Sequence, residues 1–317
     1  MVSKDLIIGA CGQIGSELTN ALRILLGVDN VIASDIRESN EALVASGPFE
    51  IIDAKDFEDI KKNVLKHNVE TIYLMAAMLS ATGEKYPEKA WDLNMTSLFN
   101  VINLAKENTI KKVFWPSSIA VFGPSTPKIN TPQQTVMEPT TVYGITKQVG
   151  ERWCEYYFNN YGVDVRSIRY PGIISWKTLP GGGTTDYAID IFHKAISDGH
   201  YDCFLNEDTA LPMMFMEDAV KATLDIMNAN TNDVKIRSSY NLSAISFTPQ
   251  ELATEIAKQI PEFNISYTPD FRQKIADSWP NSIDDSSARQ DWNWNHSYDL
   301  EAITNEMLLQ LKEKAIS

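Results

Sequence analysis

The sequence predicts an α/β protein with a doubly wound parallel sheet and a smaller C-terminal lobe. Three observations support this: short apolar segments alternate with amphipathic ones up to residue 174, the apolar runs are continuous, and the rhythm ends after that point. Continuous apolar runs are typical of strands buried on both faces. Strands that alternate with helices indicate βαβ units, in which the strands are parallel.

The elements of the first part follow one another in a regular order. "DLIIGA" opens the chain as a short buried strand, and the helix after it ends at Gly27, a residue that commonly terminates helices. Strands are expected at 5–10, 30–37, 49–56, 69–77, 111–118 and 163–174. Helices are expected at 16–27, 57–68, 91–108 and from Tyr143 onward.

The pattern changes beyond the sixth strand. Glycine and proline collect in "LPGGGTTD" (179–186), and aromatic residues become frequent. The segments "EDAVKATLDIMNA" and "SSYNLSA" fit the first domain better than this irregular region. We therefore expect one domain of residues 1–174 and 212–243, and a second lobe of residues 175–211 and 244–317.

Composition narrows the class of protein. The 317 residues are 44% hydrophobic and carry a net charge of −14, which argues against non-specific binding to nucleic acid or to anionic membranes. No signal peptide, transit segment or membrane-spanning run is visible, so we expect a soluble cytoplasmic protein. The three cysteines and four histidines are scattered, which predicts neither a disulfide framework nor a metal site.

Three glycines between the first strand and the first helix form a Gly-x-x-Gly-x-x-Gly turn at Gly9, Gly12 and Gly15. Glycines allow a tight turn and let backbone N–H groups approach a pyrophosphate at a helix N-terminus. An ordinary strand-to-helix turn also uses glycines. The strand before and the helix after favour the dinucleotide-binding Rossmann fold.

The end of the second strand bears on which dinucleotide is bound. Asp35 lies 20 residues beyond Gly15, where a carboxylate can accept hydrogen bonds from both ribose hydroxyls of NAD and would repel a 2′-phosphate. Arg37 could instead pair with such a phosphate. Because Asp35 closes the strand, we expect NAD rather than NADP.

Tyr143 and Lys147 stand one helical turn apart, a spacing that many solvated helix faces also show. Ser118 ends the fifth strand, and ligands of doubly wound sheets bind at the carboxyl ends of the strands. The Lys147 ammonium and a positively charged nicotinamide should lower the tyrosine pKa below its usual value near 10. Together with the glycine turn and Asp35, this predicts Tyr143 as general base, Lys147 as its partner and ribose ligand, and Ser118 as a donor to the reacting oxygen.

The glycine turn, "PSSIAVFG" (116–123) and Tyr143-x-x-x-Lys147 resemble the extended short-chain dehydrogenase/reductase superfamily, which contains the UDP-galactose 4-epimerases. Further stretches resemble the short-chain-type L-threonine 3-dehydrogenases: "MAAMLSATGE" (75–84), "LPGGGTTDYA" (179–188), "LPMMFMEDAVKAT" (211–223) and "DSWPNSIDDSSARQDW" (277–292). This resemblance implies metal-independent oxidation of the L-threonine 3-hydroxyl by NAD to 2-amino-3-oxobutyrate.

The resemblance also implies the residues of the site. Those expected to bind the cofactor are Gly9, Gly12, Gln13, Ile14, Gly15, Asp35, Arg37, Asp53, Ala76, Tyr143 and Lys147. Those expected to bind the substrate are Ser80, Ser118, Tyr143, Thr184, Thr185 and Trp279. "GGGTT" offers backbone N–H groups and two hydroxyls for the substrate carboxylate, although it could be a plain loop, and Trp279 could be ordinary core. Asn94 would support the site, and the helices through Asn94–Ala105 and Tyr143–Tyr157 would form a four-helix interface in a homodimer.

Two alternatives remain. A nucleotide-sugar epimerase or dehydratase must hold a diphosphate, and basic residues are few between 178 and 271: Lys194, Lys221, Lys235 and Arg237 are the main ones. A non-catalytic NAD-binding regulator would tend to lack the tyrosine or the lysine, and both are present.

Overall fold

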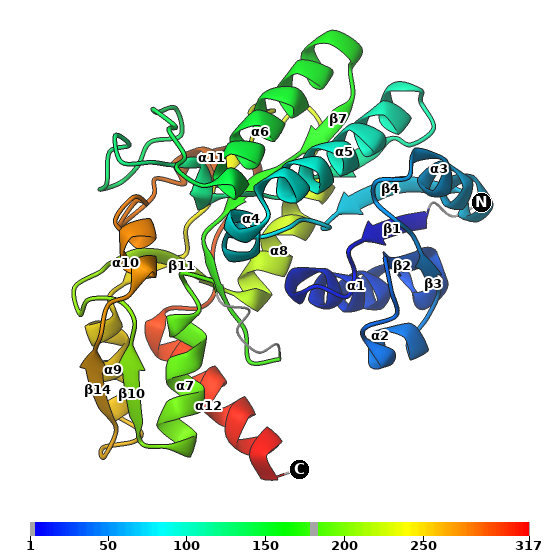
Figure 1. Ribbon diagram of the computed structural model, residues 1–317. Coiled ribbons are helices and arrows are strands. Elements are labelled where there is room, and N and C mark those ends of the chain that lie inside the picture. The colour runs from blue at the N-terminus through cyan, green and yellow to red at the C-terminus, as the bar shows by residue number, and fades with distance from the viewer. Residues whose placement is uncertain (1–3, 178–182, 317) are drawn as a thin grey trace. The chain divides into compact units, whose positions relative to one another are not determined.

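The chain folds into two compact units in a computed structural model that describes residues 4–177 and 183–316 (Figure 1). The first unit comprises residues 1–118, 141–169 and 220–240, and the second comprises residues 119–140, 170–219 and 241–317. The structure thus groups 119–140 with the second unit, whereas the boundaries expected from the sequence include them in the first.

A six-stranded parallel sheet forms the centre of the first unit, in the order β3-β2-β1-β4-β5-β7. The strands are β1 (Lys4–Ile8), β2 (Val31–Asp35), β3 (Phe49–Ile51), β4 (Val69–Leu74), β5 (Lys112–Phe114) and β7 (Asp164–Arg166). Strands β2 and β3 follow β1 on one side of the sheet, and β5 and β7 follow β4 on the other side. The chain reverses between these two strands, and such a switch point is where doubly wound sheets bind ligands. This is the Rossmann-type α/β architecture that the sequence predicts.

Helices connect these strands. They are α1 (Gln13–Leu26), α2 (Glu41–Ala45), α3 (Phe57–His67), α4 (Ser80–Lys85), α5 (Pro87–Lys106) and α6 (Val142–Tyr161), with a short 3-10 helix at Val28–Asn30 after α1. Helix α8 (Met216–Asn228) spans the boundary between the units along the chain. Helices α5 and α6 lie side by side (Figure 1). No helix in the described part of the chain is long and apolar enough to cross a membrane.

Apolar side chains from the sheet and from α3, α5 and α6 form one continuous core. Leu6, Ile72 and Val113 contribute from three neighbouring strands, and Leu98 and Cys154 from α5 and α6. All five are fully buried. Burial on both faces explains why the strands read as continuous apolar runs.

Two of the expected strands are interrupted in the structure, and both contain a proline. Pro116 separates β5 from β6 (Ser117–Ser118), and Pro171 separates β8 (Ile168–Tyr170) from β9 (Gly172–Ile174). Proline has no N–H to donate to a neighbouring strand, so it ends regular pairing. The single sixth strand expected at 163–174 is wrong: the segment forms three short strands, of which only β7 joins the large sheet, and Pro171 accounts for the break between β8 and β9. Strands β6 and β8 pair in a small sheet of order β12-β8-β6, where β12 is Tyr240–Asn241.

The second unit contains two further sheets. One has the order β13-β11-β9, in which β11 (Leu211–Phe215) runs parallel to β9 and antiparallel to β13 (Ile245–Phe247). The other pairs β10 (His200–Cys203) with β14 (Asn264–Tyr267) in parallel. Its helices are α7 (Tyr187–Ser197), α9 (Pro249–Ala257), α10 (Phe271–Ala276), α11 (Ser286–Trp292) and α12 (Leu300–Ile316), with a 3-10 helix at Ile119–Val121.

Candidate active site

The glycine turn connects β1 to α1 at the switch point of the large sheet. Gly9 has a φ of +90°, and a Cβ there would lie 2.5 Å from the Ala76 backbone nitrogen. A Cβ on Gly15 would lie 2.2 Å from the Gly9 carbonyl oxygen. Both positions therefore require glycine because of contacts within the protein itself.

Gly12 is different, because nothing in the protein excludes a side chain there. It has an extended backbone conformation, and the atom nearest to an added Cβ would be the Gly9 oxygen, at an ordinary contact distance of 3.4 Å. Gly12 is also the N-cap of α1, and it supplies no side chain to cap the N–H groups of Gln13, Ile14 and Gly15. A helix N-terminus without a capping side chain suits a phosphate, so these residues fit the pyrophosphate of NAD.

Asp35 ends β2 with its carboxylate held by the backbone. One oxygen accepts from the Cys11 N–H at 3.0 Å and the other from the Ile36 N–H at 2.8 Å. Each carboxylate oxygen can accept more than one hydrogen bond, so the group can still bind ribose hydroxyls. Arg37 is exposed two residues further on.

The other predicted cofactor residues lie on the loops that follow β3 and β4. Asp53 follows β3, and its carboxylate accepts from the Lys55 N–H at 2.9 Å. Ala76 follows β4, and its N–H donates to the Ile8 carbonyl at 2.9 Å, which holds this loop against the end of β1. Both residues therefore lie at the carboxyl ends of strands, where doubly wound sheets bind ligands.

Helix α6 presents Tyr143 and Lys147 on one face. Its N-terminus is fixed by the Thr141 side chain, which accepts from the Gly144 N–H, and by Glu84, which accepts from the Val142 N–H at 2.8 Å. A hydrogen bond joins the hydroxyls of Ser118 and Tyr143. The structure thus brings Ser118 and Tyr143 together, as the sequence predicts.

Lys147 is 3% exposed and lies beneath the tyrosine. Its Nζ donates to the Pro116 carbonyl at 2.5 Å and lies 4.6 Å from the centre of the Trp115 ring and 5.5 Å from that of Tyr143. This close approach depends on Gly150, where a Cβ would lie 2.3 Å from the Trp115 ring. A glycine on the buried face of α6 therefore lets the helix lie directly against the end of β5.

Burial changes the proton equilibria of this pair. It raises the pKa of Tyr143 to about 12, although the hydrogen bond from Ser118 opposes the shift. Burial also lowers the pKa of Lys147 to about 7, although Cys154 and Glu151 oppose that shift. Removal from water therefore dominates the Tyr143 pKa in the protein without cofactor. The lowering expected from the Lys147 ammonium together with a positively charged nicotinamide stays a prediction.

Asn94 connects two parts of the site from its buried position on α5. Its Oδ1 accepts from the Met78 N–H at 2.8 Å, and its Nδ2 donates to the Met78 carbonyl and to the Thr146 hydroxyl. The Thr146 hydroxyl in turn donates to the Tyr143 carbonyl at 2.8 Å. Asn94 therefore ties the loop after β4 to the first turn of α6. Ser80 is the first residue of α4, the short helix that continues from this loop.

Three predicted substrate residues belong to the second unit. Thr184 and Thr185 lie in the turn before α7, where Thr184 is buried and a Cβ on Gly172 would lie 2.7 Å from the Thr185 methyl group. Trp279 is 7% exposed and follows α10, and its carbonyl accepts from Lys128 at 3.1 Å. Two glycines of "GGGTT", Gly181 and Gly182, lie outside the described residues.

Glu151, which was not among the residues predicted from the sequence, lies one turn beyond Lys147 on the same face of α6. Its carboxylate is fully buried and is paired with Arg169. Its position could have been noticed in the sequence, because a carboxylate eight residues after Tyr143 lies on the same helix face as Tyr143 and Lys147.

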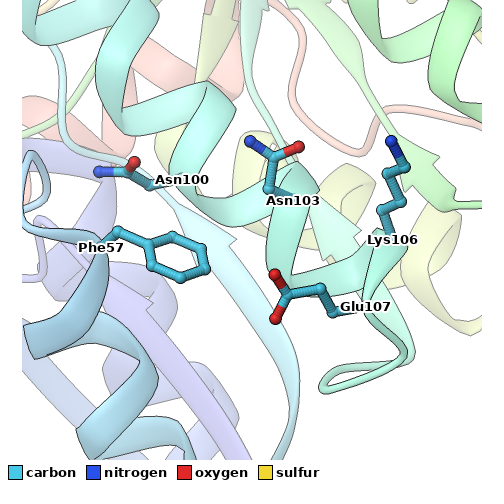
Figure 2. A pocket seen from close by; sticks show the side chains of 5 residues that line it. All are labelled: Phe57, Asn100, Asn103, Lys106 and Glu107. Carbon is cyan, nitrogen blue, oxygen red and sulfur yellow. The ribbon is translucent and has the colours of Figure 1, made fainter.

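A cavity of about 450 Å³ lies elsewhere on the first unit, on α3 and the C-terminal part of α5. Figure 2 shows the side chains around it: Phe57, Asn100, Asn103, Lys106 and Glu107. It contains none of the predicted site residues. Among residues 4–177 and 183–316, no cluster of three or more histidine, cysteine or acidic side chains could hold a metal ion.

Comparisons with known proteins agree with this geometry. Residues 6–243 match the NAD dependent epimerase/dehydratase family. An uncharacterized epimerase/dehydratase of Staphylococcus saprophyticus is 49% identical over 99% of both chains. Among solved structures, a partial consensus L-threonine 3-dehydrogenase is 56% identical with a TM-score of 0.94, covering 98% of this chain and 99% of that one. The holo form of a GalE-like L-threonine dehydrogenase from Cupriavidus necator is 55% identical with a TM-score of 0.95, covering 97% and 99%.

Proposed function

The chain belongs to the NAD dependent epimerase/dehydratase family, and from this premise we propose that it is a metal-independent L-threonine 3-dehydrogenase. The similarity to L-threonine 3-dehydrogenases over nearly the whole chain supports the substrate. The arrangement of Ser118, Tyr143 and Lys147 supports the chemistry, because it places a phenol, a hydroxyl donor and a buried ammonium at the carboxyl end of the sheet.

The chain's own residues would divide the work as follows. Tyr143 takes the proton of the substrate 3-hydroxyl, and Ser118 aligns the same oxygen. Lys147 supports the ionised phenol and holds the ribose of the cofactor, while the turn at Gly12 and the Asp35 carboxylate hold its pyrophosphate and its second ribose. Bound NAD supplies the acceptor for the hydride that leaves C3.

The protonation state of the Tyr143 phenol sets the pH range in which the oxidation proceeds. A base with a pKa of about 12 is almost entirely protonated at neutral pH. The first turn of α6, where Tyr143 lies, and a positively charged nicotinamide both favour the phenolate. We therefore expect turnover to rise with pH through the alkaline range, and NAD to lower the pKa of Tyr143 relative to the free protein.

Substrate recognition remains a prediction. Ser80, Thr184 and Thr185 carry hydroxyls suited to a carboxylate, and Trp279 would form an apolar wall.

We also propose a homodimer formed through α5 and α6. Aromatic side chains cluster on the outer face of these helices, where Trp153 packs edge-on against Phe99 and Tyr156. Tyr156, which contacts Trp153, is 47% exposed, and Trp91 on α5 is 46% exposed. Burying large aromatics of this kind is a common source of interface energy.

Turnover measured by NADH absorbance at 340 nm tests the function. The protein with NAD and a panel of 3-hydroxy amino acids should produce NADH with L-threonine and be unaffected by chelators. Tyr143→Phe removes the base but little volume, so turnover should fall roughly 10²- to 10⁴-fold while NADH binding persists.

Tyr156→Phe provides a matched control, because it removes the hydroxyl of an exposed tyrosine on the same helix. It should leave turnover nearly unchanged. Absence of NADH production with any hydroxy amino acid, together with interconversion of nucleotide sugars, would favour the epimerase instead. Near-normal turnover by Tyr143→Phe would remove the tyrosine from the mechanism.

A further inference from the structure

Three consecutive residues at the carboxyl end of β5 each bond to the same face of α6. The Pro116 carbonyl accepts from Lys147, and the Ser118 hydroxyl is bonded to Tyr143. Between them, the Ser117 hydroxyl donates to the Glu151 carboxylate at 2.6 Å. The partners on α6 are spaced four residues apart, so they lie along one stripe of the helix.

Glu151 is the member of this stripe for which we predict no contact with NAD or with the substrate. Its carboxylate is fully buried, as are Ser117 at 1% exposure and Arg169 at 2%. Arg169 on β8 binds it with two hydrogen bonds, Nε to Oε1 at 2.9 Å and Nη2 to Oε2 at 2.7 Å. A buried carboxylate is retained only when its charge is balanced and its oxygens are bonded, and both conditions hold here.

We propose that Glu151 is a positioning residue of the active site, and this inference rests on the proposed function. Through Ser117 its carboxylate holds the 116–118 segment against α6, so that the Ser118 hydroxyl meets Tyr143 and the Pro116 carbonyl meets Lys147. Arg169 fixes the carboxylate from the far side and prevents it from turning toward Lys147.

The charge of Glu151 has a second consequence. The groups that face Lys147 are Tyr143, Glu151 and Cys154 on its own helix, the Trp115 ring from the end of β5, and the Pro116 carbonyl. Burial lowers the pKa of Lys147 to about 7, and the Cys154 and Glu151 charges oppose this. Burial also raises the pKa of the Cys154 thiol, so this group stays neutral at working pH. Glu151 is therefore the carboxylate that supports protonated Lys147.

Ser117→Ala tests the positioning role because it removes the link and leaves the Glu151–Arg169 pair intact. We expect kcat for threonine to fall roughly 10-fold, since small misalignments of reacting groups are costly, with little change in NADH affinity. Ser167→Ala is the matched control: Ser167 is also buried in the first unit, and its hydroxyl bonds to Ser239 at 3.0 Å. Equal kcat for the two variants would overturn the positioning role.

Glu151→Gln tests the charge. The amide oxygen can still accept from Ser117, but the negative charge is lost. We expect the pKa of Lys147 to fall, so that the pH at which Lys147 loses its proton moves down by about one unit. NADH affinity, followed by fluorescence between pH 6 and 10, should weaken at correspondingly lower pH, because Lys147 holds the ribose.

The NADH measurement separates this inference from the proposed function. If the unaltered protein oxidises no hydroxy amino acid, the function fails, and the shift in NADH affinity still tests Glu151. Should Glu151→Gln fail to fold because Arg169 loses its carboxylate partner, Glu151→Leu combined with Arg169→Met removes both charges at similar volume. The shift should then have the same direction but be smaller, because the Arg169 charge that disfavours protonated Lys147 is lost as well. An unshifted pH dependence in the folded variant would overturn the electrostatic role.

Discussion

Replacing Asp5 with asparagine should stabilise the protein at neutral pH. Asp5 lies on β1, is 8% exposed and faces Thr71 on the neighbouring strand β4. Burial raises its pKa from 3.8 to about 6, although hydrogen bonds with Thr71 and Tyr73 and the charge of Lys112 oppose the shift. The ionised carboxylate is therefore a cost to the folded state.

The shift of the Asp5 pKa gives the size of this cost in folding free energy and the pH range in which it applies. A group whose pKa is raised on folding binds its proton more tightly in the folded state, so its contribution is most favourable below pH 3.8. That contribution is lost as pH rises, and above about pH 6 the full cost is present. A shift of about two units corresponds to about 3 kcal/mol. This is an upper value for Asp5→Asn, because the asparagine amide must also replace the carboxyl group in its hydrogen bonds with Thr71 and Tyr73.

Thermal unfolding between pH 4 and 8 measures the effect. At pH 7.5 the melting temperature of Asp5→Asn should exceed that of the unaltered protein by up to roughly 6 °C, and the two should converge near pH 4. Asp164→Asn is the opposing control. Burial raises the pKa of Asp164, but Arg166 and Arg237 outweigh it and hold the value below the ordinary one. This variant should be less stable at pH 7.5, with a gap that narrows in acid.

A melting temperature of Asp5→Asn below that of the unaltered protein at pH 7.5 would refute the reasoning. So would an equal gain at pH 4 and pH 7.5, because a pH-independent effect would come from packing rather than from the charge.

Three further predictions follow from the cofactor turn and from α6. Gly12→Ala should melt within about 2 °C of the unaltered protein but bind NADH roughly 10-fold more weakly. Gly15→Ala should instead destabilise the fold itself, because its Cβ would lie 2.2 Å from a carbonyl oxygen. If Gly12→Ala bound NADH as tightly as the unaltered protein, the pyrophosphate would not lie at the Gly12 turn. Asp35→Ala should reduce the preference for NAD over NADP by roughly 10-fold in isothermal titration, and an unchanged ratio would assign selectivity to another residue. Light scattering at micromolar concentration should give a dimer mass, and Tyr156→Glu should give a monomer; a monomeric unaltered protein would contradict the interface.

The sequence alone determined the α/β class, the glycine turn, Asp35 and the Tyr143–Lys147 pair. Each of these depends on local spacing: a turn needs its glycines within a few residues, and two side chains four apart on a helix share a face whatever surrounds them. The strands with continuous apolar runs could also be predicted, because a strand buried on both faces is apolar at successive positions.

Tertiary structure alone decided the properties that depend on distant neighbours. The breaks after Phe114 and Tyr170 follow from prolines, but which fragment joins which sheet follows from the pairing partners available to it. The pairing of Glu151 with Arg169, and the effect of burial on the Tyr143 pKa, depend on which side chains the sheet and α6 bring together from separate parts of the chain. Local sequence specifies what a group can do chemically, and the fold sets its access to water and to charge, which fixes its protonation state.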